Sequence, residues 1–113
     1  MPYINLKTTV SVDSDKGKAL KAKFGKAIEN FPGKSEKWLV VGVEDNARLW
    51  FAGSDEGCAY TEVALLGTAS DAAYESMTAA LTDIISSELA ISPDKIYIKY
   101  EECTHWGWNG GNF

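Results

Sequence analysis

The sequence predicts an α+β domain in which two helices pack on one face of a single β-sheet. Three observations lead to this fold class. Stretches of alternating hydrophobicity flank two stretches of helical periodicity, the order strand, helix, strand occurs twice, and 113 residues suit one domain spanning residues 1–113. The resulting βαββαβ order of two similar halves predicts a pseudo-symmetric domain.

The first half begins with a strand and a helix. The segment Tyr3 to Thr8 alternates, with Ile4 and Leu6 on one side, as a half-buried strand does. After a turn over Ser11 to Asp15, apolar residues recur at spacings of three and four, and Pro32-Gly33 ends this amphipathic helix. The apolar stripe of the helix consists of Leu20, Phe24, Ala27, Ile28 and Phe31.

The first half ends with a second strand. Trp38 to Val43 is a continuous apolar run rich in β-branched residues, which favours a central strand over a second helix. A short segment, Leu49-Trp50-Phe51, follows and ends at Gly53.

The second half repeats this order. A strand from about Cys58 to Leu66 is separated by Gly67 from a helix over about Asp71 to Leu89. A turn at Ser92-Pro93-Asp94 then leads into a strand over Lys95 to Glu101. The apolar stripe of the second helix consists of Met77, Leu81, Ile84, Ile85 and Leu89.

With both helices on one side, the other face of the sheet is left exposed, and we expect it to be apolar. An exposed apolar sheet face is usually buried against another subunit. The sequence therefore predicts a homo-oligomer whose sheets surround a common axis.

Composition and charge exclude several classes of protein. A net charge of -5 argues against nucleic acid as a general partner, and no apolar run is long enough to span a membrane. The N-terminus lacks the charged-then-apolar order of a secretory signal, so the expected compartment is cytoplasmic. Cys58 and Cys103 are expected to be reduced. A cluster of lysines is expected to form a solvated helix face: Lys16, Lys18, Lys21, Lys23 and Lys26.

Pro2 has the most direct chemical consequence. Removal of Met1 would turn it into a free secondary amine. An α-amino group titrates at roughly 7.7–8.0, and burial or a neighbouring cation lowers that pKa toward neutrality. A base of this strength suits proton-transfer catalysis.

Other candidate sites are weak. His105 is the only histidine, so a metal site would need Cys103 and either Glu101 or Glu102, which crowd one strand end. Cys103 and His105 also lack an evident orienting group for a nucleophilic pair. We therefore expect no metal site here.

Six groups of residues, spread in order over nearly the whole chain, carry a family resemblance. Through them the sequence resembles the macrophage migration inhibitory factor family of the tautomerase superfamily. They are Met1-Pro2, Pro32-Gly33-Lys34, Phe51-Ala52-Gly53-Ser54 with Cys58-Ala59, Leu66-Gly67, Ile91 to Ile98, and Trp106-Gly107-Trp108-Asn109-Gly110.

The resemblance implies a four-stranded mixed sheet and a homotrimer around a central channel, with three active sites at subunit boundaries. It implies keto-enol tautomerisation of a small aromatic α-keto acid such as phenylpyruvate, without metal or cofactor. The N-terminal proline at the base of each site would act as the catalytic base.

The resemblance also assigns roles to other residues. Lys34 would bind the substrate carboxylate and lower the pKa of the Pro2 amine, and the backbone N–H of Leu66 would help hold that carboxylate. Tyr97 would reach the substrate from the neighbouring subunit. Without the resemblance these are a surface lysine, a core leucine and a strand tyrosine. The expected walls of the pocket are Trp38, Trp108 and Phe113, for which core packing is the competing interpretation. Trp106 occupies a position that is aliphatic in the best-known members and would change the shape of the rim.

Three features of the chain qualify what the family implies. Lys99 stands where vertebrate members have an asparagine, and a second cation there would either favour a more acidic substrate or weaken the binding of hydroxyphenylpyruvate. Cys58-Ala59-Tyr60-Thr61 lacks the second cysteine of a CxxC pair, so we expect no dithiol redox activity. Asn109-Gly110-Gly111-Asn112 is expected to be a flexible turn that lets Phe113 fold back over the pocket.

Two alternatives to an enzyme stay open. One is a secreted cytokine-like or host-modulating protein of the same fold, which binds a protein receptor and for which the pocket is incidental. Family members leave cells without a signal peptide, so this non-classical route is compatible with the sequence. The other is a purely structural or binding module, in which Pro2 and Lys34 would be coincidences.

Overall fold

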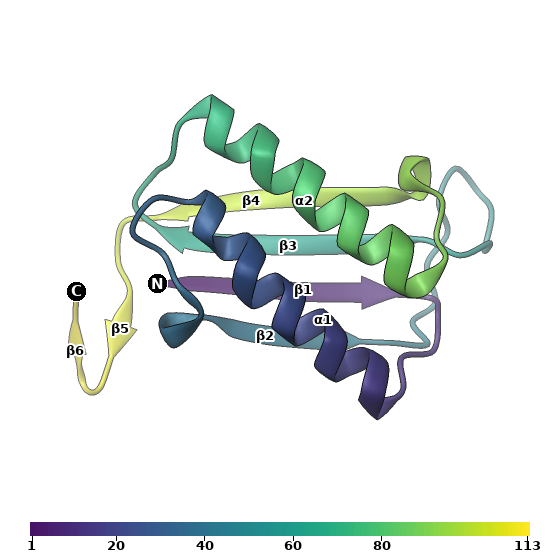
Figure 1. The fold of residues 1–113 in the computed structure, drawn as a ribbon, viewed down its shortest axis with the longest axis horizontal. Coiled ribbons are helices and arrows are strands. Elements are labelled where there is room, and N and C mark those ends of the chain that lie inside the picture. Colours follow the sequence, from purple (N-terminus) through teal and green to yellow (C-terminus); the bar gives the residue numbers. More distant parts are fainter.

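Strand β1 (Pro2–Thr8) lies inside a four-stranded sheet in the computed structural model, which describes residues 1–113. It pairs in parallel with β2 (Val40–Glu44) and antiparallel with β3 (Ala59–Leu66). Strand β4 (Ile96–Cys103) pairs in parallel with β3, so the order is β2-β1-β3-β4. The predicted mixed sheet of four strands is confirmed (Figure 1).

Both long helices cover the same face of this sheet (Figure 1). The Asp13 side chain caps α1 (Ser14–Ala27) by accepting the Lys16 N–H, and Ser70 caps α2 (Asp71–Leu89) by accepting the Ala73 N–H. Three short 3₁₀ helices adjoin the longer elements: η1 (Ile28–Asn30), η2 (Glu36–Trp38) and η3 (Pro93–Lys95).

The core fills the layer between the helices and the sheet, and most of the predicted apolar positions lie in it. Ile4 and Leu6 of β1 are fully buried, as the alternation of that strand predicts. Ile84 is only half-buried at the edge of the core. The buried residues of the two helices and the segment after α1 are Leu20, Phe24, Ala27, Ile28, Phe31, Met77, Leu81, Ile85 and Leu89.

The prediction of a central strand over 38–43 is wrong. Trp38 ends the 3₁₀ helix η2, and the strand runs from Val40 to Glu44 at the outer edge of the sheet. Val40 is 61% exposed there, because it is in register with Tyr3 on the open face and no strand of this chain pairs with the far side of β2. A run of β-branched residues indicates a strand but not the position of that strand in the sheet.

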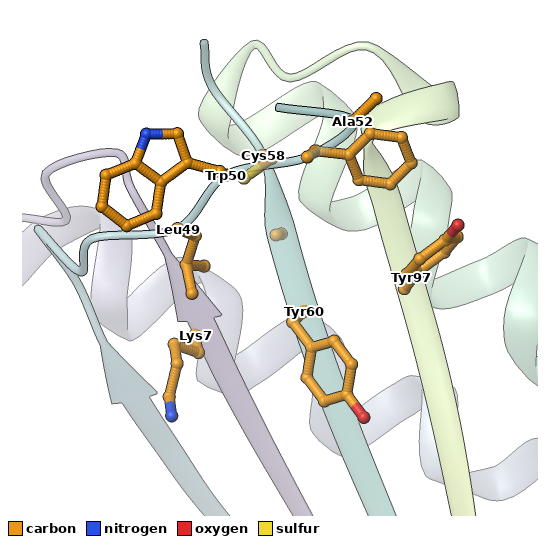
Figure 2. A pocket seen from close by; sticks show the side chains of 9 residues that line it. Lys7, Leu49, Trp50, Ala52, Cys58, Tyr60 and Tyr97 are labelled. Atoms are coloured by element: carbon orange, nitrogen blue, oxygen red, sulfur yellow. The ribbon is translucent and has the colours of Figure 1, made fainter. Parts of the chain in front are cut away.

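The prediction of an apolar open face is also wrong. Alternation turns every second residue away from the helices, and Figure 2 shows Lys7, Tyr60 and Tyr97 on that outer face. Glu62 is in register with Lys99 on the same face. Aromatic rings and unlike charges therefore share the open face, since each strand carries polar residues at the outward positions.

Helix α2 ends in a strained residue. Ala90 has the left-handed conformation, with φ 55° and ψ 40°, which costs an L-residue about 1–2 kcal/mol. We expect Ala90→Gly to raise the free energy of unfolding by about 0.5–1 kcal/mol, because the gain exceeds the added freedom of the unfolded chain. Chemical denaturation measures this.

Ala79→Gly is the matched control in the same helix. Ala79 is exposed in the interior of α2, so the same substitution should lower the free energy of unfolding by about 1 kcal/mol. Equal signs for the two variants would contradict the assignment of strain to Ala90.

Neither helix combines the length and the apolar character that a membrane-spanning segment needs.

Candidate active site

The first residues of the chain lie against the end of β3. Pro2 is buried and is in register with Leu65. The carbonyl of Met1 accepts a hydrogen bond of 3.0 Å from the Leu66 N–H. The backbone before Pro2 is therefore fixed at the place where a trimmed chain would carry its amine.

A tight turn brings Lys34 to the same place. The Lys34 N–H donates to the Phe31 carbonyl at 3.0 Å, and Gly33 takes a φ of 79° that favours glycine. Phe31 is buried and anchors the turn through an edge-on contact with Tyr74, at 5.4 Å between ring centroids. Beyond the turn, Lys34 Nζ donates to the Leu66 carbonyl at 3.0 Å.

The electrostatics of the corner formed by the chain start, Lys34 and Leu66 favour a neutral amine. Burial, and then the neighbouring Lys34 ammonium, lower the pKa of the Met1 amino group from its ordinary value of 8.0. The one ion pair of the chain joins Lys23 and Glu88, so no carboxylate neutralises Lys34. The corner thus holds an unpaired cation beside a weakened base.

The three predicted wall residues form one aromatic cluster. The ring centroid of Trp38 lies 5.1 Å from that of Trp108 and 6.0 Å from that of Phe113, and Trp108 stacks on Phe113 at 5.7 Å. Phe113 also donates its N–H to the Trp106 carbonyl at 3.1 Å. The half-buried Trp106 side chain makes no ring contact with the cluster.

The C-terminal segment is a small hairpin rather than the predicted flexible turn. Strands β5 (Gly107–Trp108) and β6 (Gly111–Asn112) pair antiparallel, and Asn109 and Gly110 both take positive φ. Asn-Gly is the preferred pair for a two-residue hairpin turn of this kind, so the turn is ordered. Figure 1 shows this hairpin at the same end of the sheet as the N-terminus.

Tyr97 and Lys99 lie elsewhere in the same chain. Leu65, opposite Pro2, is in register with Glu102, which is five residues beyond Tyr97. At a rise of about 3.3 Å per residue, Tyr97 is roughly 17 Å along the strand from that level. One chain therefore does not bring Tyr97 or Lys99 to Pro2.

Tyr97 lines one side of a pocket of about 470 Å³ on the open face (Figure 2). The Tyr97 ring contacts Phe51 at 4.9 Å between centroids. Lys7, Trp50 and Tyr60 line other parts of the pocket. Sequence reasoning missed this pocket, although the apolar segment Leu49-Trp50-Phe51 before a tight turn was a signal for it.

The remaining candidates form no second site. Cys58 is buried, Cys103 is half-buried, and both are free thiols. No group of three or more His, Cys, Asp or Glu residues is arranged to hold a metal ion. The His105 ring forms a hydrogen bond with the Thr104 hydroxyl, at 3.1 Å.

The sequence and the fold have counterparts among known proteins. Residues 1–113 match the family model described as "Macrophage migration inhibitory factor (MIF)". The chain is similar to the Macrophage migration inhibitory factor of Meriones unguiculatus, at 31% identity over 83 residues, which is 72% of each chain. It is 26% identical to that of Xenopus laevis over 100% of this chain and 99% of the relative.

Solved structures agree with the sequence comparison. The crystal structure of MIF2 from Leishmania major has a TM-score of 0.94 to this chain at 31% identity, covering 100% of this chain and 97% of the other. A homologue from Prochlorococcus marinus has a TM-score of 0.83 at 27% identity, with 98% of both chains covered. The likeness extends over the whole domain.

Proposed function

Because the chain belongs to the macrophage migration inhibitory factor family, a branch of the tautomerase superfamily, we propose that it is a keto-enol tautomerase. Its substrates are small aromatic α-keto acids of the phenylpyruvate type. Pro2 is the catalytic base, and it acts after Met1 has been removed.

The observation that carries this proposal is the corner formed by the chain start, Lys34 and Leu66. The α-amino group there has a lowered pKa, because it is buried and because Lys34 adds a positive charge. A lowered pKa leaves a larger share of the amine unprotonated at a given pH, and only the unprotonated form can accept a proton. Loss of Met1 also frees the Leu66 N–H, which donates to the Met1 carbonyl in the untrimmed chain.

The proposed reaction moves one proton and shifts one pair of electrons. The nitrogen lone pair of Pro2 takes the enol O–H proton, the carbonyl re-forms as the C=C electrons shift to carbon, and Pro2 returns the proton to that carbon. Lys34 and the Leu66 N–H hold the substrate carboxylate during both transfers. The reverse direction uses the same groups in the opposite order.

The proposed assembly is a homotrimer in which a neighbouring subunit completes each pocket. Tyr97 and Lys99 are too far from Pro2 to serve their own chain, so they act on the substrate bound by the neighbour. The aromatic cluster of Trp38, Trp108 and Phe113 supplies a wall for the substrate ring, with Trp106 at the rim.

The direct test follows the enol-to-keto conversion of phenylpyruvate by absorbance. Intact mass spectrometry first establishes that Met1 is absent. We expect the trimmed protein to convert the enol well above the rate in buffer alone. A trimmed, folded protein that leaves the buffer rate unchanged would show that the proposal is wrong.

Lys99 is expected to set the preference between keto acids. It is exposed and forms no ion pair in the chain, so its ammonium is available to a second substrate carboxylate. Lys99→Asn should raise the KM for an α-keto diacid by about 10-fold, since a charge-assisted hydrogen bond contributes about 1.5–3 kcal/mol. The KM for phenylpyruvate should stay within about twofold.

The matched control for Lys99 is Lys26→Gln on the exposed side of α1, which removes an equal charge far from the sheet face. Steady-state kinetics with both keto acids measure the preference. Equal changes for the two substrates in Lys99→Asn would contradict a specific role for this lysine.

A further inference from the structure

Few contacts of the Tyr97 side chain hold it in one orientation. Its side chain is among the exposed large apolar groups, at 60% exposure, and its hydroxyl makes no hydrogen bond within the chain. An exposed tyrosine of this kind samples several rotamers, and fixing one on binding a ligand costs conformational entropy. A tyrosine that meets a substrate benefits from being fixed beforehand.

Phe51 supplies the contact that fixes it. The two ring centroids are 4.9 Å apart, with the ring planes at 53°, a separation at which aromatic pairs attract each other. Trp50, the preceding residue, makes no ring contact with Tyr97, and Figure 2 shows its indole pointing away from Tyr97. The support for the Tyr97 ring therefore comes from Phe51.

Phe51 is itself held from two directions. Its N–H donates to the Ser54 carbonyl at 2.8 Å, and the Ser54 N–H donates back to the Phe51 carbonyl at 3.0 Å. Lys95 Nζ lies 5.4 Å from the centroid of the Phe51 ring, within the range of a cation–π contact. The Phe51 ring is therefore held by a hydrogen-bonded two-residue turn and by a cation–π contact with Lys95.

The backbone of this turn is strained at Ala52. Ala52 has a φ of 51° and Gly53 a φ of 79°, and the first of these is unfavourable for alanine. The reciprocal hydrogen bonds to Ser54 hold the strained residue in place. The turn is therefore a defined support for the Phe51 ring and not a loose loop.

We propose that Phe51 is a positioning residue that holds the Tyr97 ring in the orientation in which it meets the substrate. This rests on the proposed function, in which Tyr97 contacts the substrate of the neighbouring subunit. Phe51 does not itself touch the substrate and acts only through Tyr97.

The kinetic test is a double-mutant cycle on the trimmed, full-length protein with phenylpyruvate. Phe51→Leu keeps an apolar side chain of similar size and should raise KM by about fivefold while kcat stays within about twofold. In a Tyr97→Ala background, Phe51→Leu should change KM by less than about 1.5-fold. Trp50→Leu, the matched control, should leave KM unchanged, since Trp50 does not support Tyr97.

A structural readout separates this inference from the proposed function. Tyrosine-specific isotope labelling allows the ring protons of Tyr97 to be followed by NMR, and the nearby Phe51 ring shifts their resonances. Phe51→Leu should move these resonances and broaden them, whereas Trp50→Leu should not. This measurement does not require turnover.

The outcomes are distinguishable. Equal KM effects of Phe51→Leu with and without Tyr97 would overturn the inference and leave Phe51 with a purely structural role. Unchanged Tyr97 resonances in Phe51→Leu would overturn it as well. A wild-type protein without activity would overturn the proposed function, and the NMR shifts would then report alone whether Phe51 fixes the ring.

Discussion

A chain with one alanine inserted between Met1 and Pro2 is expected to lose about 10²- to 10⁴-fold in kcat for phenylpyruvate tautomerisation, the contribution typical of a general base. The insertion keeps Pro2 but places its nitrogen in an amide, which has no basic lone pair. The added backbone also occupies the place of the Met1 carbonyl, which accepts from the Leu66 N–H. The enol absorbance assay on the purified, mass-verified protein measures the loss.

Pro2→Gly gives a graded comparison. The trimmed variant keeps an amine at the same place, but this primary amine lacks the ring that fixes its direction, so an intermediate rate is expected. Equal rates for the wild-type protein, the inserted chain and Pro2→Gly would show that the N-terminal nitrogen is not the base.

Lys34→Gln is expected to have the second largest effect. It should both raise KM and shift the pH profile. It removes the only unpaired cation of the corner, so KM for an α-keto acid should rise about 10- to 100-fold, as expected for a charge-assisted contact of about 1.5–3 kcal/mol. The KM for the keto acid, from initial rates, measures this part.

Lys34→Gln should shift the pH profile in one direction only. Lys34 lowers the pKa of the neighbouring α-amine, and the base is active only when it is unprotonated. Removing the charge should therefore raise this pKa and move the acidic limb of the kcat/KM profile to higher pH. Burial, the larger cause of the lowering at the chain start, remains in the variant, so the pKa should rise only part of the way toward its ordinary value. Lys26→Gln is the charge-matched control, and an equal shift in both variants would contradict a local effect.

The helices and their buried faces were predictable from sequence because helical periodicity is a local property. Leu20, Phe24 and Ile28 repeat at a spacing of four, and this alone places them on one side of α1 and of the 3₁₀ helix η1 that follows it. Asp13 and Ser70 cap the two helices from the positions where such residues are expected. For these elements the information lies within about four residues along the chain.

Contacts between distant residues were not predictable in this way. Lys34 meets the Leu66 carbonyl across 32 residues, and only the family resemblance suggested that the two belong together. The Phe51 and Tyr97 rings meet because the turn after Trp50 folds over β4, and no residue pattern encodes that meeting. The position of β2 at the sheet edge likewise depends on strand pairing, which local hydrophobicity does not report.

The charged open face limits how subunits can associate. Glu62 and Lys99 lie opposite each other on adjacent strands without forming an ion pair in the chain, and Lys7 projects from the same face. Dehydrating such groups costs several kcal/mol for each ion. A surface that covers this face must either enclose water or bring countercharges, so the association should depend on ionic strength rather than on dry apolar contact alone.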